Sequence, residues 1–229
     1  MQSSSREVHS SQTRLHPRLG ETVLRHRRAL WQKPAQAVDG PALAALDASL
    51  AAHKGPVVLD SFCGTGMSSH ILAGCNPQSL VIGVDKSAQR MGRGGEQLEN
   101  CVLLRAHCEA VWRHLAERGL VLKAHYVLYP NPWPKPAHLR RRVHGHPAFP
   151  LLLQLGGKLE LRSNWQLYVE EFGVALHLNG IAGCVSCIAQ DEEPLTLFER
   201  KYRASGQRLW RLSAQLTSAS AKESATSTP

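Results

Sequence analysis

The sequence lacks the features that mark membrane and secreted proteins. No apolar run reaches about 18 residues, so we expect no transmembrane helix and no membrane partner. The first 20 residues contain no apolar stretch of the kind that a secretory signal requires. These two classes of protein are therefore not indicated.

The six cysteines lack the paired spacings of a zinc site or a disulfide framework. They are scattered through apolar segments, which indicates small buried side chains in a reducing cytoplasm. Cys184 and Cys187 form one C-x-x-C motif, but residues three apart on a strand face opposite sides. We therefore predict a cytoplasmic protein that holds no metal.

Acidic residues are scarce relative to basic ones. The chain has 18 Asp and Glu against 27 Lys and Arg, a formal net charge of +9, and 12 histidines that gain charge below neutral pH. A field of this sign attracts polyanions such as nucleic acid or an acidic membrane surface. The alternative is charge that only keeps the protein in solution, and composition does not separate the two.

What the sequence contains is an alternation of short apolar runs and helical patterns. Apolar strands that alternate with helices are typical of a parallel sheet covered on both faces. We predict a doubly wound α/β domain over residues 36–216, monomeric, with a mostly parallel sheet of about seven strands. The predicted strands are 56–61, 79–85, 101–106, 124–129, 157–163, 181–189 and 207–215, and the helices are 41–53, 67–74, 87–99, 108–118, 147–154 and 165–177.

Two terminal segments lie outside this domain. Residues 1–35 are polar and rich in arginine, and we predict a basic, partly disordered arm. The arm is either a solvated tail or a segment that contacts phosphate. Residues 217–229 are rich in Ser, Thr and Ala without periodicity, which predicts a disordered tail.

The first predicted strand runs into a glycine-containing turn, "VVLDSFCGTGMSS". Gly64 and Gly66 allow the backbone to turn tightly and to approach a ligand closely. The next strand ends at Asp85, nineteen residues beyond Gly66, where a carboxylate is placed to accept hydrogen bonds from ribose hydroxyls. The pattern predicts a nucleotide-like ligand at this turn.

The details of the turn favour S-adenosylmethionine over a dinucleotide. The third glycine of the dinucleotide pattern is absent, because Ser69 stands three residues after Gly66. The acidic Asp60 in front of the turn disfavours a pyrophosphate and suits a ligand with an ammonium or sulfonium group. The alternative is an ordinary strand–helix turn with an acidic residue facing solvent.

The fourth predicted strand opens into "YPNPWPKPAHLRRR", residues 129–142. Proline has no backbone donor and a fixed φ, so no strand or helix is expected to run through this stretch. Trp133 offers a flat face on which an unstacked base could lie. Lys135 and the three arginines at 140–142 offer contacts to phosphate, with His138 beside them. The alternative is a solvated, charged loop.

This loop resembles the Pro-Asp-Pro-Trp-x-Lys…His…Arg-Arg signature of the bacterial tRNA (guanine-N7)-methyltransferase family. Two further stretches agree in order and spacing, "GGKLELRSNWQLYVEEF" and "TLFERKY" followed by "GQRLWRL". The resemblance covers about residues 50–215. It implies the class I methyltransferase fold, which is Rossmann-like, and methyl transfer from S-adenosylmethionine to N7 of a guanine in the variable loop of tRNA.

The resemblance also implies roles for single residues. Asp60 would lie near the amino group of the cofactor, Asp85 at its ribose, and Asn131 between the methyl donor and the guanine. Gly64, Gly66 and His107 complete the residues implied at the cofactor. The residues implied at the guanosine and tRNA are Trp133, Lys135, His138, Arg140, Arg141, Arg142, Asn164, Thr196, Phe198 and Glu199, with Glu199 as the acceptor for the amino edge of guanine.

The chain departs from the family pattern at four positions. Phe62 replaces the first glycine of the turn, and Asn131, Asn164 and His107 each stand where the family has Asp. The loss of two carboxylates at Asn131 and Asn164 weakens the recognition of guanine more than the chemistry. Two alternatives therefore stand beside tRNA methylation: an enzyme acting on another RNA or a small-molecule acceptor, and a non-catalytic RNA-binding module.

Overall fold

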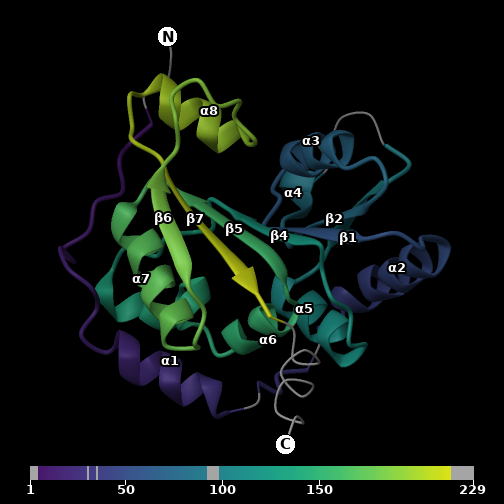
Figure 1. Ribbon diagram of the computed structural model, residues 1–229, viewed down its shortest axis with the longest axis horizontal. Helices are drawn as coiled ribbons and strands as arrows, with labels where there is room; N and C mark the ends of the chain where they lie inside the picture. Colours follow the sequence, from purple (N-terminus) through teal and green to yellow (C-terminus); the bar gives the residue numbers. More distant parts are fainter. Residues whose placement is uncertain (1–4, 30, 35, 92–97, 218–229) are drawn as a thin grey trace, which may run out of the picture. The chain divides into compact units, whose positions relative to one another are not determined.

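The structure is a computed structural model that describes residues 5–29, 31–34, 36–91 and 98–217. In these ranges seven strands form one mostly parallel sheet in the order β3-β2-β1-β4-β5-β7-β6 (Figure 1). The predicted fold class is confirmed. The strands are β1 Val57–Ser61, β2 Leu80–Asp85, β3 Cys101–Arg105, β4 Ala124–Leu128, β5 Gly157–Ser163, β6 Gly183–Cys187 and β7 Trp210–Leu216.

Helices occupy the connections between the strands. The α-helices are α1 Leu19–Arg27, α2 Asp39–Ala52, α3 Met67–Cys75, α4 Ala88–Met91, α5 Cys108–Glu117, α6 Phe149–Gln154, α7 Gln166–His177 and α8 Leu197–Ala204; two 3-10 helices are η1 Pro136–Arg141 and η2 Val143–Gly145. None of the helices within the described ranges is long and apolar enough to cross a bilayer.

The contacts divide the chain into two compact units. The glycine-loop unit comprises Gln32–Val127, Leu151–Leu159 and Leu216–Pro229. The proline-loop unit comprises Met1–Trp31, Leu128–Pro150 and Glu160–Gln215. The predicted boundaries at residues 36 and 216 stay predictions, and the predicted tail lies outside the described residues apart from Thr217.

The glycine-loop unit is built on parallel strands. β1 pairs with β2 and with β4, and β2 pairs with β3, all in parallel. Every residue of β1 and β2 is buried, as expected for strands covered on both faces. α3 packs on β2 and β3, α2 packs on β3 and α5, and α5 also packs on β2 (Figure 1). The continuous apolar runs therefore became buried strands because helices cover them.

Gly83 explains how α3 comes so close to the sheet. A Cβ at Gly83, on β2, would lie 2.3 Å from the Ser69 Oγ and 2.6 Å from the Leu103 Cδ2. The close approach of helix and strand is thus made possible by a glycine on the strand, while the helix carries Ser69. In the dinucleotide pattern the glycine is on the helix.

The proline-loop unit pairs β6 with β7 in the antiparallel direction. α7 packs on β6 and buries Tyr168, Phe172 and Leu176. α1 packs on α7 and on η2 (Figure 1). The N-terminal segment is therefore part of this unit from residue 5 onward, where the sequence predicted only a polar arm.

Several local predictions need correction. α1 and α8 were not expected, and η1 begins at Pro136, inside the stretch expected to hold no helix. The helix predicted over 87–99 is observed only as α4, and residues 92–97 lie outside the described ranges. Three of the six cysteines, Cys75, Cys184 and Cys187, are exposed and not buried as predicted.

Gly157 is a test of the packing between β5 and the segment that precedes β4. Its φ is +78°, and a Cβ there would lie 2.1 Å from the backbone oxygen of Leu122. Gly157→Ala is expected to lower the free energy of unfolding by about 3 kcal/mol or more, because backbone must shift. Gly119 has a φ of +63° with nothing within 4 Å of its Cβ position. Gly119→Ala should cost only about 1–2 kcal/mol. Denaturant unfolding measures both variants. If both lost the same free energy of unfolding, the backbone around Gly157 would accommodate a Cβ without cost.

Candidate functional site

The turn after β1 depends on three residues with positive φ. Phe62 has a φ of 66°, Gly64 of 62° and Gly66 of 83°. A side chain at Gly66 would be strained by the positive φ, and its Cβ would lie 2.6 Å from the Leu103 Cδ1, so glycine is favoured there. Phe62 adopts a conformation that is costly for a side chain, and its ring meets the edge of Trp112 at 6.0 Å between centroids. The ring is therefore held on Trp112.

Asp60 is a buried carboxylate with one unsatisfied oxygen. Its Oδ2 accepts hydrogen bonds from the Ser68 Oγ at 2.6 Å and the Ser69 Oγ at 2.7 Å. Its Oδ1 is buried and has no hydrogen-bond partner in the described part of the chain. Burial raises the pKa of Asp60 to about 6, against the two serine hydroxyls, which lower it. A buried acceptor without a donor fits a site for an ammonium group.

Asp85 closes the glycine turn from the end of β2. Its Oδ2 accepts from the backbone N–H of Gly64 at 3.1 Å, and its Oδ1 accepts from the backbone N–H of Ser87 at 2.8 Å. The Arg90 Nη2 also donates to Oδ1 at 3.0 Å, from a side chain that is 43% exposed. Asp85 therefore lies at the turn as predicted, and a ribose hydroxyl on Oδ1 would share it with Arg90 or displace the arginine.

His107 is tied to a different element. Its backbone N–H and its Nδ1 both approach the Asp39 Oδ1, at 2.9 and 3.1 Å. Burial opposes ionisation of Asp39, yet the hydrogen bonds from His107 and from the Gln36 N–H lower its pKa. His107 thus joins the start of α5 to the start of α2. Its predicted role at the cofactor stays a prediction.

The raised pKa of Asp60 leads to a prediction for ligand binding. Below about pH 6 the carboxyl group becomes neutral and no longer attracts an ammonium group, so the affinity for S-adenosylmethionine should fall as the pH drops from 7 to 5. Calorimetric titration across this range measures it. Asp60→Asn should bind more weakly at pH 7 and lose this pH dependence. The same dependence in Asp60→Asn would assign it to another group.

The loop after β4 gathers a cation and an imidazole around one indole. Trp133 has a φ of 45°, and the Arg141 guanidinium lies 4.8 Å from the centre of its ring. The ring of His138 meets it edge-on at 5.4 Å. Partial burial and the charges of Arg141 and Lys135 lower the pKa of His138, which favours its neutral form. The indole is thereby fixed between two polar groups.

Other predicted residues of this loop face solvent. Asn131 is exposed, and its Oδ1 accepts from the backbone N–H of Trp133 at 3.2 Å. Lys135, Arg140 and Arg141 are exposed. The loop therefore presents an amide, an aromatic ring and three cations along one short stretch.

The start of α8 connects to this loop through aromatic rings. Tyr129, the residue after β4, lies 5.6 Å from Tyr202 between ring centroids. Tyr202 stacks on Phe198 at 6.1 Å and 22°. Thr196 caps α8, because its side chain accepts from the Glu199 N–H. The predicted residue Phe198 is thus linked to the loop through Tyr202. Thr196 instead caps α8, and Asn164 donates to the Gln207 Oε1 at 2.9 Å.

Comparison with known proteins identifies the family. The family described as "Putative methyltransferase" matches residues 54–212, more than half of the chain. The chain belongs to this methyltransferase family.

Relatives of the methyltransferase include two proteins named tRNA (guanine-N(7)-)-methyltransferase. One, from Yersinia pseudotuberculosis serotype I (strain IP32953), is 27% identical over 180 residues, which cover 72% of this chain and 74% of the relative. The other, from Acidovorax sp. (strain JS42), is 27% identical over 209 residues, covering 85% and 82%. The resemblance seen in the motifs thus extends over most of both chains.

Solved structures share the fold of the methyltransferase at low identity. A chain described as an antibiotic-related methyltransferase superposes with a TM-score of 0.57 at 14% identity, covering 83% of this chain and 98% of that one. The 16S rRNA methyltransferase KamB superposes with a TM-score of 0.55 at 18% identity, covering 81% and 95%. These likenesses support the class I methyltransferase fold.

Arg142 corrects the interpretation of the three arginines. Its side chain is fully buried, and its Nη1 donates to the Glu171 Oε2 at 2.5 Å. A guanidinium without exposed surface does not reach a phosphate, so Arg142 is not placed in this structure to make the predicted contact with RNA. Arg140 and Arg141 remain available at the surface of the methyltransferase.

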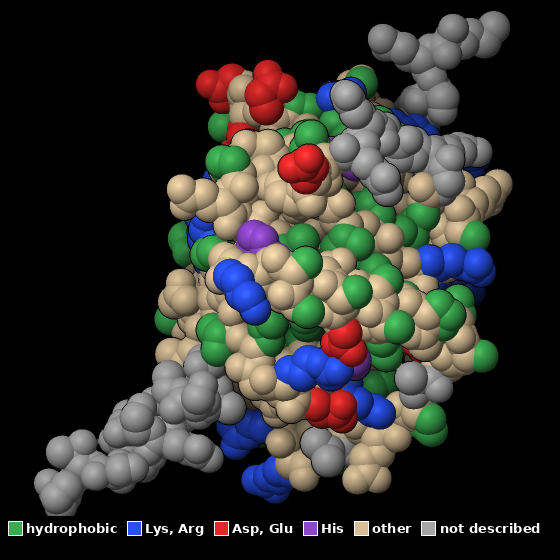
Figure 2. Space-filling view, turned by 90° about the vertical axis from the view of Figure 1, so that its right-hand side faces the viewer, with side chains coloured by type: hydrophobic (Ala, Val, Ile, Leu, Met, Phe, Trp, Pro, Cys, Tyr) green, Lys and Arg blue, Asp and Glu red, His purple; other side chains and the backbone are tan. Residues whose placement is uncertain are grey.

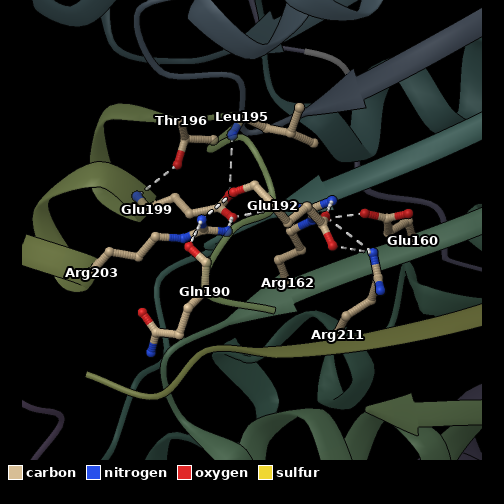
Figure 3. A network of polar contacts seen from close by, with 9 residues as sticks. All are labelled: Glu160, Arg162, Gln190, Glu192, Leu195, Thr196, Glu199, Arg203 and Arg211. Carbon is tan, nitrogen blue, oxygen red and sulfur yellow. Dashed lines mark hydrogen bonds and ion pairs between the residues drawn. The ribbon is translucent and has the colours of Figure 1, made fainter. Parts of the chain in front are cut away.

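Glu199 also differs from expectation, because its carboxylate is buried and already bound (Figure 3). Its Oε1 accepts from the Arg162 Nη1 at 3.0 Å and the Arg203 Nη2 at 2.9 Å. Its Oε2 accepts from the Leu195 N–H at 3.2 Å. Glu199 is therefore not an open acceptor for guanine in this structure.

Sequence reasoning missed the residues that hold the glycine turn after β1 and the loop after β4. Ser68 and Ser69 bind Asp60, Arg90 binds Asp85, and Glu171 binds Arg142. Ser69 was noted only as the absence of a glycine. Ser68 and Glu171 lay inside quoted motifs but were given no role, and Arg90 lay in no motif. Within the described residues, no group of three or more His, Cys, Asp or Glu is placed to hold a metal ion.

Charge is mixed on the face of the methyltransferase shown in Figure 2. Lys and Arg side chains stand in small groups there, some of them beside Asp and Glu. The net charge of +9 does not form a broad patch on this face.

Glu199 should act on stability. Glu199→Gln removes a buried negative charge and leaves Arg162 and Arg203 with one fewer anionic partner each, so the free energy of unfolding should fall by about 3 kcal/mol. Glu193 is exposed in the preceding segment, and Glu193→Gln serves as the control, with a change below about 0.5 kcal/mol. Thermal and denaturant unfolding measure both. If Glu199→Gln left the stability unaltered, the ion pairs of Glu199 would not stabilise the fold, and its predicted role as an acceptor for guanine would be favoured.

Proposed function

We propose that the protein is an S-adenosylmethionine-dependent RNA methyltransferase that modifies N7 of a guanine in the variable loop of tRNA. The observation that carries this proposal is the alignment with relatives named tRNA (guanine-N(7)-)-methyltransferase over most of both chains. The features of the two loops support it.

The glycine-loop unit supplies groups that fit the cofactor. The unsatisfied Asp60 Oδ1 suits its ammonium group, and Asp85 at the end of β2 suits its ribose hydroxyls. Gly64 and Gly66 keep side chains away from the turn. When bound, S-adenosylmethionine supplies an electrophilic methyl group on a positively charged sulfur.

The proline-loop unit supplies groups that fit RNA. The Arg141 guanidinium covers one face of the Trp133 ring, and the opposite face suits stacking of a base. Lys135, Arg140 and Arg141 are exposed and suit phosphates. The exposed amide of Asn131 donates to O6 or N7 of guanine, or accepts through its oxygen. N7 carries a lone pair and no hydrogen, so no residue of this chain has to remove a proton. Holding the base in position is the task that remains.

A methylation assay tests this proposal directly. Purified protein is incubated with radiolabelled S-adenosylmethionine and tRNA from a bacterial strain that lacks its own enzyme of this type. Label should appear in N7-methylguanine after digestion to nucleosides. Label in another nucleoside would shift the target, and its absence from all of them would remove tRNA as the substrate.

A second candidate is an RNA-binding module that does not catalyse. The contact between Arg90 and Asp85 favours it, because the guanidinium occupies a carboxylate oxygen that a ribose would need. Calorimetry separates the two candidates. Tight binding of tRNA without measurable heat from S-adenosylmethionine would favour the module, and binding of both ligands would favour the enzyme.

Substitutions in the two loops should affect different ligands, tRNA for the loop after β4 and S-adenosylmethionine for the glycine turn. Arg140→Ala with Arg141→Ala should weaken tRNA binding and reduce the slope of log affinity against log salt by about one to two, since each phosphate contact contributes close to one. The affinity for S-adenosylmethionine should not change. Asp85→Asn should do the reverse, with weaker cofactor binding and unaltered tRNA affinity. Loss of both affinities in either variant would contradict the assignment.

A further inference from the structure

Residues 10–16 precede α1 within the proline-loop unit. Three residues of this segment, Ser10, Gln12 and His16, form hydrogen bonds with distant parts of the same unit. The Ser10 Oγ donates to the backbone oxygen of Pro134. The Gln12 Nε2 donates to the Glu171 Oε1 at 2.6 Å. The backbone N–H of His16 donates to the same oxygen at 2.8 Å. The segment thus bonds both to the loop after β4 and to α7, which lie far from it in sequence.

Gln12, Arg142 and Glu171 form a closed ring of hydrogen bonds. The Gln12 Oε1 accepts from the Arg142 Nη2 at 2.9 Å, while its Nε2 donates to Glu171. The Arg142 Nη1 completes the ring at the Glu171 Oε2. Arg142 and Glu171 are fully buried side chains, so each depends on these bonds to offset the loss of water.

Glu171 stays ionised in this ring. Burial opposes its charge, but the hydrogen bond from His144 and the charge of Arg142 lower its pKa to about 2. Burial lowers the pKa of His144 itself, and its Nε2 lies 3.1 Å from the Glu171 Oε2, where an imidazole protonated on Nε2 donates a hydrogen bond. Glu171 therefore stays ionised at neutral pH and pairs with the Arg142 guanidinium.

The same ring reaches the backbone of the loop that carries the indole. The third donor of Arg142, its Nε, bonds to the backbone oxygen of Trp133 at 3.2 Å. Together with Ser10, it holds two successive carbonyl groups of the loop, at Trp133 and Pro134. Prolines at 130, 132, 134 and 136 have no N–H, so this loop has few backbone donors of its own with which to brace itself. Trp133 also has positive φ, a conformation that persists only when its surroundings hold it.

We propose that residues 10–16 are a strap that positions Trp133 for RNA, with Gln12 as the positioning residue and Arg142 as its link to the loop. This inference rests on the proposed function. Gln12 acts through Arg142 and not by contacting RNA itself. Arg142 in turn holds the backbone from which the Trp133 ring extends. The N-terminal arm then supports the Trp133 loop through the side chains of Ser10 and Gln12 and the backbone N–H of His16, and not through its arginines.

The test uses Ser10→Ala and Gln12→Met, singly and together, in the full chain. Methionine keeps the length of glutamine and removes the hydrogen bonds to Arg142 and Glu171, together with the local one to the Arg14 backbone oxygen. Thr13→Ala is the matched control, because Thr13 lies in the same segment and its side chain is exposed. Amide hydrogen exchange is followed at residues 131, 133 and 135, together with the kinetics of methyl transfer to tRNA and the affinity for S-adenosylmethionine.

The strap predicts faster exchange at these amides in the double variant, at least about tenfold, and a loss of about tenfold or more in kcat/KM for tRNA. The affinity for S-adenosylmethionine should stay within about twofold of the unmodified protein. Thr13→Ala should behave as the unmodified protein. Ser10→Ala, the mildest change, should accelerate exchange without lowering the melting temperature appreciably.

Two results would overturn the strap. One is unaltered exchange at residues 131–135 in the double variant. The other is faster exchange with tRNA kinetics unaltered, which would make the contact purely structural. If the unmodified protein transfers no methyl group to tRNA, the proposed function fails. The strap is then tested by the exchange rates together with the affinity for tRNA, which should fall in the double variant if the strap positions the loop for RNA.

Discussion

The buried ion pair between Arg142 and Glu171 is the interaction on which the proline-loop unit depends. Neither side chain has any exposure, so water cannot stabilise their charges, and each polar atom must find a partner in the chain. The partners come from the N-terminal segment, from η2 and from the loop of Trp133. One requirement, that a buried charge be paired, thereby helps to join three separate stretches of the chain. The network around Arg162, shown in Figure 3, applies the same requirement to β5, α8 and β7.

Asp60 stands apart from these networks because its pairing is incomplete. Two serine hydroxyls satisfy one oxygen, and the other has no donor among the residues described. The buried carboxylates of Asp85, Glu171 and Glu199 all have a cationic partner, so an open carboxylate oxygen beside a glycine turn fits the binding of a ligand. The raised pKa of Asp60 has the same origin, since burial penalises the charge until a cation arrives. The unsatisfied oxygen and the raised pKa therefore have one cause.

The parallel strands could be predicted because their signal is local. Buried strands need runs of apolar residues, and β1 to β5 were expected within one residue of their observed ends. α8 could not be found in this way, because its buried residue is Glu199 while Leu197 and Phe198 are exposed. Half of the buried residues of α1, Thr22 and His26, are polar as well. Hydrophobic periodicity is silent where a helix is anchored by hydrogen bonds and ion pairs.

The three consecutive arginines show what each level of structure decides. The sequence by itself determined that a cationic stretch follows a proline-rich loop, and that glycines and acidic residues mark the ends of β1 and β2, because these follow from residue chemistry and local spacing. Only the tertiary structure decided that Arg140 and Arg141 face solvent while Arg142 is buried. The partners of Arg142 lie 130 and 29 positions away, at Gln12 and Glu171. Those distant neighbours decide whether an arginine lies at the surface or in the core, and their positions exist only once the chain has folded.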